Sequence, residues 1–214
     1  MSKFENCKDE IAKDLGIFVD PSVIDIVCEN CDVKNTGHMS KDERIKLYAR
    51  FMPEYFGTTY HTLRLDALGF FTSPASTKRH GAYKGGLFDH SFCVAKYLVE
   101  LTEKLSLKWE NPRSPYIVGM FHDLCKCGLY SVKEDGGYTF NDVLIIPGHA
   151  ERSLILLQKF IDLTDEEIAC IRWHMGAYET DTRLWSCLHE AIVKYPNVLW
   201  THTADMYVSK VLGV

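Results

Sequence analysis

Apolar residues recur at spacings of three and four through several segments of the chain, which is the pattern of helices that pack one face against a core. Residues 87–105 and 197–212 follow it over several turns. Residues 116–121 are apolar almost throughout and predict a short buried helix. We therefore expect an all-α protein, built as a helical bundle.

Local signals refine this picture. Residues 40–43 and 164–167 each read as a capping box, Ser or Thr followed three positions later by Glu, and each predicts a helix start. Pro147 and Gly148 precede a further predicted helix over 149–161. Apolar and polar residues alternate convincingly only over 130–140. An Asp-Gly-Gly turn within this segment predicts one small β-hairpin.

The chain divides by its pattern into two parts. Residues 1–56 predict an N-terminal helical extension, with a helix start at Asp20-Pro21, and packing or partner contact is its expected role. Residues 57–214 form the main domain. Cys28 and Cys31 have the spacing of half a zinc knuckle but lack a second pair, so we expect no structural zinc there.

Composition narrows the class of protein. The 214 residues are 46% hydrophobic and 25% charged, and the net charge is -5. This balance provides no general attraction for nucleic acid, so long duplexes are not expected as partners. The N-terminus lacks an apolar signal core, no apolar run approaches the roughly 20 residues that span a bilayer, and the eight Cys show no disulfide rhythm. We expect a cytoplasmic protein that does not bind membranes.

The dipeptide His122-Asp123 ends the apolar run of 116–121 and is the first candidate for chemistry. Burying an ionised carboxylate in an apolar interior costs on the order of several kcal/mol, unless a cation or strong hydrogen-bond donors bind it. A single His-Asp pair is ordinarily a salt bridge or a cap. Other inward residues strengthen the metal interpretation: His90 shares the core face of its helix, and Asp205 interrupts the apolar face of the last one.

Further histidines begin or end predicted helices, which brings the candidate metal ligands to six: His90, His122, Asp123, His149, His174 and Asp205. Four imidazoles and two carboxylates can hold two divalent ions with one carboxylate bridging. Mixed nitrogen and oxygen ligands suit Mn, Fe, Co, Ni or Zn better than Mg or Ca. Two such ions can clamp the attacking and leaving oxygens of a phosphoryl displacement.

A Gly-rich basic segment runs directly into the helix of His90. It supplies Lys78, Arg79, His80 and Lys84 as donors for phosphate oxygens, and its glycines allow close approach of a ligand. The alternative interpretation is a solvated basic loop.

This ordered pattern resembles the HD-domain superfamily of metal-dependent phosphohydrolases. The resemblance rests on His90, His122-Asp123 and Asp205, on the Gly-Gly-Leu lead-in at 85–87 and on the His-Asp-x-x-Lys form. It covers about residues 70–210. The interposed histidines match the two-metal branch, and the chain is most like the HD module of bacterial 3′-to-5′ exoribonucleases and small phage or bacterial HD hydrolases.

The resemblance implies an HD-domain bundle in which the six ligands hold two metal ions, with Asp123 as the bridge. A metal-bridged hydroxide would attack phosphorus, and Lys126 would reach a phosphate oxygen or Asp123. Lys78, Arg79 and Lys84 would bind substrate, and His80 is a candidate for protonating the leaving group. The Gly-Tyr-Pro signature and the oligonucleotide-binding module of some relatives are absent, which argues against cyclic di-GMP and against processive attack on long RNA.

The expected substrate is a nucleotide, a cyclic dinucleotide, a short oligonucleotide or another small phosphorylated compound. Two other functions fit the same residues. One is an HD-fold mixed-valent di-iron oxygenase that acts on a polyol or a phosphonate. The other is a catalytically silent nucleotide-binding module, which would bind a ligand without turnover.

Overall fold

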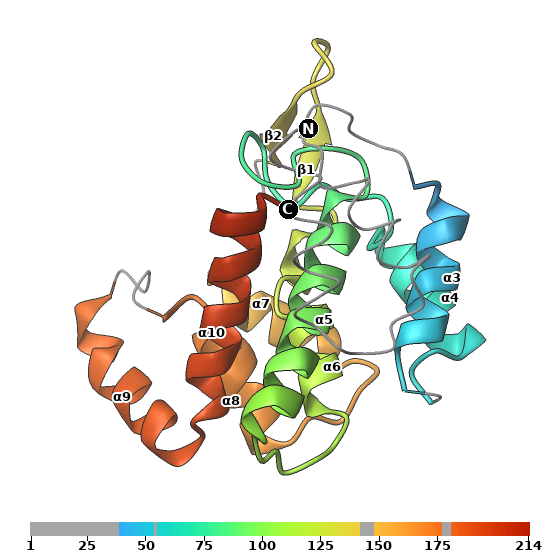
Figure 1. Ribbon diagram of the computed structural model, residues 1–214. Helices are drawn as coiled ribbons and strands as arrows, with labels where there is room; N and C mark the ends of the chain where they lie inside the picture. Colours follow the sequence, from blue (N-terminus) through green and yellow to red (C-terminus); the bar gives the residue numbers. More distant parts are fainter. Residues whose placement is uncertain (1–38, 54, 142–147, 177–180) are drawn as a thin grey trace, which may run out of the picture.

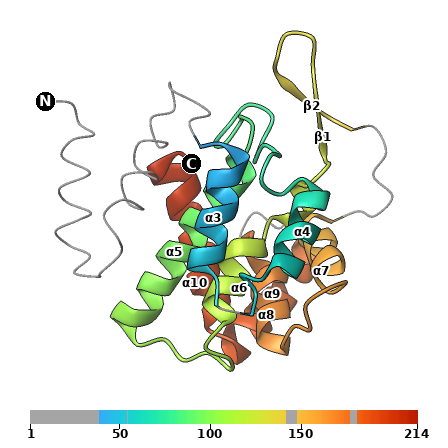
Figure 2. The same cartoon turned by 90° about the vertical axis from the view of Figure 1, so that its right-hand side faces the viewer.

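A long central helix organises the fold. The computed structural model describes residues 39–53, 55–141, 148–176 and 181–214 (Figure 1). Helix α5 (Gly86–Leu105) packs along α6 (Ser114–Phe121) and along α10 (Asn197–Tyr207). Helices α3 (Lys41–Phe51) and α4 (Thr59–Leu68) lie on the opposite side of α5 from α9, as Figures 1 and 2 show.

The remaining elements complete the bundle and bear the hairpin. They are η1 (Leu124–Lys126), β1 (Tyr130–Val132), β2 (Tyr138–Phe140), α7 (His149–Leu157), α8 (Asp165–Trp173), η3 (Thr182–Leu184), α9 (Trp185–Lys194) and the π-helical turn η4 (Val208–Leu212). The hairpin is antiparallel, with Tyr130 opposite Phe140. The expectation of an all-α fold with one small β-hairpin is confirmed.

Both predicted capping boxes are present. Ser40 accepts a hydrogen bond from the backbone of Glu43 while the Glu43 side chain accepts from the backbone of Ser40. Thr164 and Glu167 make the same reciprocal pair at the start of α8. Each box satisfies two backbone N–H groups that a helix start leaves without partners, which is why these short polar sequences mark helix boundaries reliably.

Some boundaries and elements differ from the sequence predictions. Helix α7 ends at Leu157, not near Ile161, because Lys159 and Phe160 bond to carbonyls three residues back and tighten the chain into turns. Helices α4 and α9 are elements that the sequence pattern above does not predict. The predicted helix start at Asp20 and the pair Cys28 and Cys31 lie outside the described residues.

The core beneath the site is built from interlocked aromatic rings and one close helix contact. Tyr48 of α3 is fully buried against Phe71 and Phe121, so the described part of the N-terminal segment packs on the main core. At Gly119 of α6, an added Cβ would lie 2.3 Å from the Cα of Ala95. Helices α5 and α6 therefore meet backbone to backbone.

A buried ion pair attaches α3 to the start of α5. The Nε and NH2 groups of Arg44 donate to the two carboxylate oxygens of Asp89 at 2.8 and 2.9 Å. The NH1 group donates to the Met39 carbonyl. Gly85, at φ +87°, lies against the guanidinium so closely that a Cβ there would overlap it. Asp89 immediately precedes His90, so this pair also fixes the helix segment that presents the first predicted ligand.

Candidate metal centre

The six predicted ligands meet at one place, although they come from separate elements. They are supplied by α5 (His90), the end of α6 (His122 and Asp123), the first position of α7 (His149), the end of α8 (His174) and α10 (Asp205). Together with Cys125 Sγ, their ligand atoms fall into overlapping groups of three residues, and within each group all atoms lie within 4.8 Å of one another. Residues up to 115 positions apart in the sequence thus share one site.

Asp123 lies at the centre of the cluster, and both of its carboxylate oxygens face imidazole nitrogens. Oδ2 is 3.5 Å from His122 Nε2 and 3.7 Å from His90 Nε2. Oδ1 is 3.6 Å from His174 Nε2 and is hydrogen-bonded to His149 Nε2. A carboxylate placed between two sets of nitrogens has the arrangement that a bridging ligand requires.

Asp205, on α10, is the second carboxylate of the cluster. Its Oδ1 is 3.2 Å from His90 Nε2 and 3.9 Å from His122 Nε2. The predicted inward orientation of this residue is therefore what the fold adopts.

Three of the imidazoles are oriented by backbone carbonyls. The Nδ1 atoms of His90, His122 and His174 lie 2.8, 2.9 and 2.7 Å from the carbonyl oxygens of Val214, Gly119 and Ile171. A carbonyl oxygen only accepts, so each Nδ1 donates its hydrogen, and a neutral ring then presents the Nε2 lone pair.

The lone pairs of these rings converge. His90 Nε2 and His122 Nε2 are only 3.3 Å apart. His174 Nε2 is fully buried and has no hydrogen-bond partner among the described residues. A buried acceptor left unpaired costs about 1–3 kcal/mol. A divalent transition-metal ion fits this set of donors, because it accepts several nitrogen lone pairs together with carboxylate oxygens.

Asp123 is the carboxylate of the site that has two cationic neighbours, Lys126 and His149. Burial alone would raise the pKa of Asp123, but Lys126, whose Nζ lies 2.5 Å from Oδ2, and the nearby imidazoles hold that pKa well below its usual range. Burial opposes the charged form of His149, yet the Asp123 carboxylate outweighs it and raises the pKa of His149 to about 10. His122, enclosed on all sides, has its pKa lowered to about 3 by burial. Without metal, Asp123 therefore lies between an ammonium and an imidazolium.

His80 lies beside the cluster. Its ring centroid is 4.9 Å from that of His90. Burial, followed by the neighbouring His90, lowers the pKa of His80 to about 4. His80 is then neutral at pH 7, which makes it a poorer acid than the sequence interpretation assumed.

The basic segment ahead of α5 forms a folded loop. Ser76 Oγ accepts from the backbone N–H of Arg79 and donates to the carbonyl of His80. Lys78, Arg79 and Lys84 are exposed. Within the described ranges none of these three cations hydrogen-bonds or pairs with the six ligands, so they are available to solvent and to a ligand that approaches the loop.

One site neighbour was not foreseen from the sequence. This neighbour is Cys125, whose Sγ lies 3.0 Å from His149 Nδ1. The sequence signal is the spacing His-Asp-x-Cys, which places the thiol two residues after Asp123.

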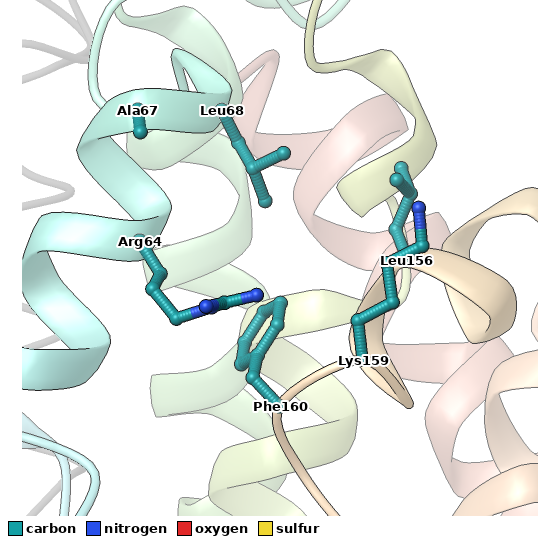
Figure 3. A pocket seen from close by; sticks show the side chains of 6 residues that line it. All are labelled: Arg64, Ala67, Leu68, Leu156, Lys159 and Phe160. Carbon is teal, nitrogen blue, oxygen red and sulfur yellow. The ribbon is translucent and has the colours of Figure 1, made fainter.

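A separate groove of about 220 Å³ lies between α4 and the end of α7. Figure 3 shows Arg64 beside the ring of Phe160 at this groove, with Lys159 nearby. Because none of the six ligands lines it, the groove is distinct from the candidate metal centre.

Comparisons with protein-family models, with curated proteins and with solved structures gave no match to this chain. Among the described residues, no helix combines the length and the apolar character needed to cross a membrane.

Proposed function

We propose that the chain is a metal-dependent phosphohydrolase of the HD-domain type that holds two divalent transition-metal ions. The observation that supports this most directly is the convergence of imidazole lone pairs on the carboxylates of Asp123 and Asp205. A buried nitrogen without a partner at His174 and a carboxylate faced from both sides at Asp123 are what such ions would satisfy.

The ions, when bound, supply an activated water and neutralise charge on a phosphoryl group. The role of the protein is to fix the ligands beforehand. The rings of His90, His122 and His174 are held through Nδ1, so little reorganisation is needed when a metal enters.

Lys126 places an ammonium group directly at the ligand cluster. Its ammonium group pairs with Asp123 Oδ2 and retains further N–H donors that can reach a phosphate oxygen. The exposed Lys78, Arg79 and Lys84 then provide a second zone of positive charge, which favours small or short anionic substrates on a chain of net charge -5.

The test is a screen of phosphomonoesters, cyclic dinucleotides and short 3′-ended oligonucleotides, with Mn added. Asp123→Ala is the inactive variant, and Asp42→Ala, at an exposed position in the first turn of α3, is the matched control. We expect turnover of at least one substrate class by the wild type and the control, and at least a 10³-fold loss (order of magnitude) in Asp123→Ala with helical content retained. Equal turnover in Asp123→Ala would contradict the proposal.

The same preparations separate the other two functions. Bound iron with consumption of oxygen would indicate the di-iron oxygenase, and nucleotide binding without turnover under every divalent metal would indicate the silent module. The basic residues of the 78–84 segment favour hydrolysis of a phosphoester.

A further inference from the structure

His149 is held differently from the other three imidazoles of the site. Their Nδ1 atoms face backbone carbonyls, whereas His149 Nδ1 faces the thiol sulfur of Cys125 at 3.0 Å. His149 is also the least enclosed of the four, with 31% of its side chain exposed against none for the others. Its orientation therefore depends more on this one contact.

The backbone around His149 adds little constraint. It is the first residue of α7 and follows Gly148, whose φ of +88° is outside the helical range. Since α7 begins at His149, no earlier turn of that helix fixes the direction of the ring. A side-chain partner at Nδ1 is then what sets both the tautomer and the aim of Nε2.

Cys125 is itself rigidly placed. It is fully buried in η1, and its backbone N–H donates to Ser153 Oγ at 3.0 Å. Ser153 lies one turn after His149 on α7. Cys125 thus contacts two successive turns of one face of α7, by its backbone and by its sulfur.

We propose that Cys125 is a positioning residue for His149, and that its sulfur accepts the Nδ1 hydrogen and leaves Nε2 free to bind one of the two metal ions. The inference rests on the proposed function. The sulfur contacts the ring through Nδ1 while Nε2 is bonded to Asp123, so the two partners use different nitrogens of the ring. This favours a role behind the ligand over direct metal binding by the thiolate.

The test measures metal binding to the full chain by titration with Co, using Cys125→Ala, Cys125→Ser and the neighbouring Cys127→Ala as matched control. We expect two ions per chain in the wild type. Loss of a partner behind a metal-bound His typically weakens binding by about 10–100-fold, and we expect this in Cys125→Ala for one ion only. Cys125→Ser, which retains an acceptor, and Cys127→Ala should bind both ions within about threefold of the wild type.

Two further variants separate this role from general packing. Ser153→Ala removes the backbone anchor of Cys125 but not the sulfur, so it should keep both ions. In a His149→Ala background, Cys125→Ala should cause no further loss of metal affinity, because Cys125 affects metal binding only through the His149 ring.

The outcomes are distinct. If the wild type binds no Co at all, the proposed function fails. If it binds two ions and Cys125→Ala binds both equally well, only the positioning role fails. A thiolate-to-cobalt charge-transfer band that disappears in Cys125→Ala would also overturn it, in favour of direct ligation. Should Cys125→Ala not fold, the tautomer of His149 in the metal-loaded wild type decides by NMR: hydrogen on Nδ1 supports the proposal, and hydrogen on Nε2 overturns it.

Discussion

Arg44 forms a two-pronged, fully buried ion pair with Asp89, the residue directly before His90. The pair joins α3 to the first turn of α5, so the position of His90 depends on a residue, Arg44, that is not itself a ligand and lies 46 positions before it in the sequence. Buried ion pairs of this kind are not strong stabilisers relative to apolar residues, but breaking one leaves an uncompensated charge.

Arg44→Met is therefore expected to lower the free energy of unfolding by about 3–5 kcal/mol, measured by urea denaturation. The double variant Arg44→Met with Asp89→Leu should recover much of that loss, because no buried charge remains. Lys41→Met is the control, since the Lys41–Asp66 pair is exposed and should be worth at most about 1 kcal/mol. A loss no larger in Arg44→Met than in this control would show that the buried pair has no special weight.

Gly119→Ala is expected to destabilise the protein by about 1–3 kcal/mol or more, since the added methyl group would overlap the backbone of Ala95. Forcing α6 away from α5 also moves His122, so metal affinity should fall in the same variant. Gly137→Ala, where a Cβ meets only the Asp135 side chain in the hairpin turn, is the comparison. Thermal unfolding and metal titration of both variants test this. Equal stability and equal metal affinity in the two variants would count against the close contact between α5 and α6.

Acid should destabilise the protein through His61. This ring is buried among Tyr55, Tyr60 and Phe160, and neither of its nitrogens has a partner within the described part of the chain. Burial lowers the pKa of His61 below its ordinary 6.5. The unfolded chain then binds more protons than the folded one as pH falls below 6.5, so stability is lost in that direction.

His61→Phe should remove this contribution. Urea midpoints measured between pH 7.5 and 5 should fall less steeply in the variant than in the wild type. At pH 7.5 we expect the variant to be more stable by about 1 kcal/mol, because an unpaired buried polar group has been replaced. If the urea midpoint of the variant falls with pH as steeply as that of the wild type, a group other than His61 titrates in this range.

Metal binding should be linked to protons. The pKa of His149 is raised to about 10 in the metal-free protein, so its ring is charged at pH 7 and must lose a proton before Nε2 can bind a metal. The affinity for the ion at this position should therefore rise about tenfold for each pH unit between 6.5 and 8.5. Calorimetric titrations in buffers of different ionisation enthalpy would measure the released proton, and pH-independent binding would contradict this prediction.

Metal should also stabilise the fold. At a free-ion concentration 100 times its dissociation constant, each bound ion adds about 2.7 kcal/mol to the free energy of unfolding. His174→Leu is expected to lose the contribution of one ion, and the exposed His189→Leu should keep both. Thermal unfolding with Mn or with a chelator checks this, and equal metal-induced shifts in the two variants would rule out His174 as a ligand.

The sequence was informative where its signal was local or strongly periodic. The helix at 86–105 and both capping boxes were predictable because long apolar faces and reciprocal caps depend on near neighbours. Helix α4 buries only His61 and Leu65 and has no clear apolar face to read. Helix α9 does have one, because Leu188, Ala191 and Ile192 pack against the core, but it is short and none of its residues is fully buried.

For the site, the types of residue indicated which side chains would converge, and the fold brings all six together. The partners behind them could not be predicted. The carbonyl of Val214 reaches His90 across 124 positions, and a carbonyl has no residue-specific signature. The contact of Cys125 with His149 depends on how η1 docks on α7, which is set by tertiary packing.

The use of main-chain oxygens behind three of the four imidazoles has a consequence for redesign. No side-chain replacement at Val214, Gly119 or Ile171 deletes those acceptors, so these hydrogen bonds are lost only when the backbone itself moves. Only His149 relies on an atom that a single codon change can exchange. Attempts to change which metal this centre prefers should therefore begin with the contact between Cys125 and His149.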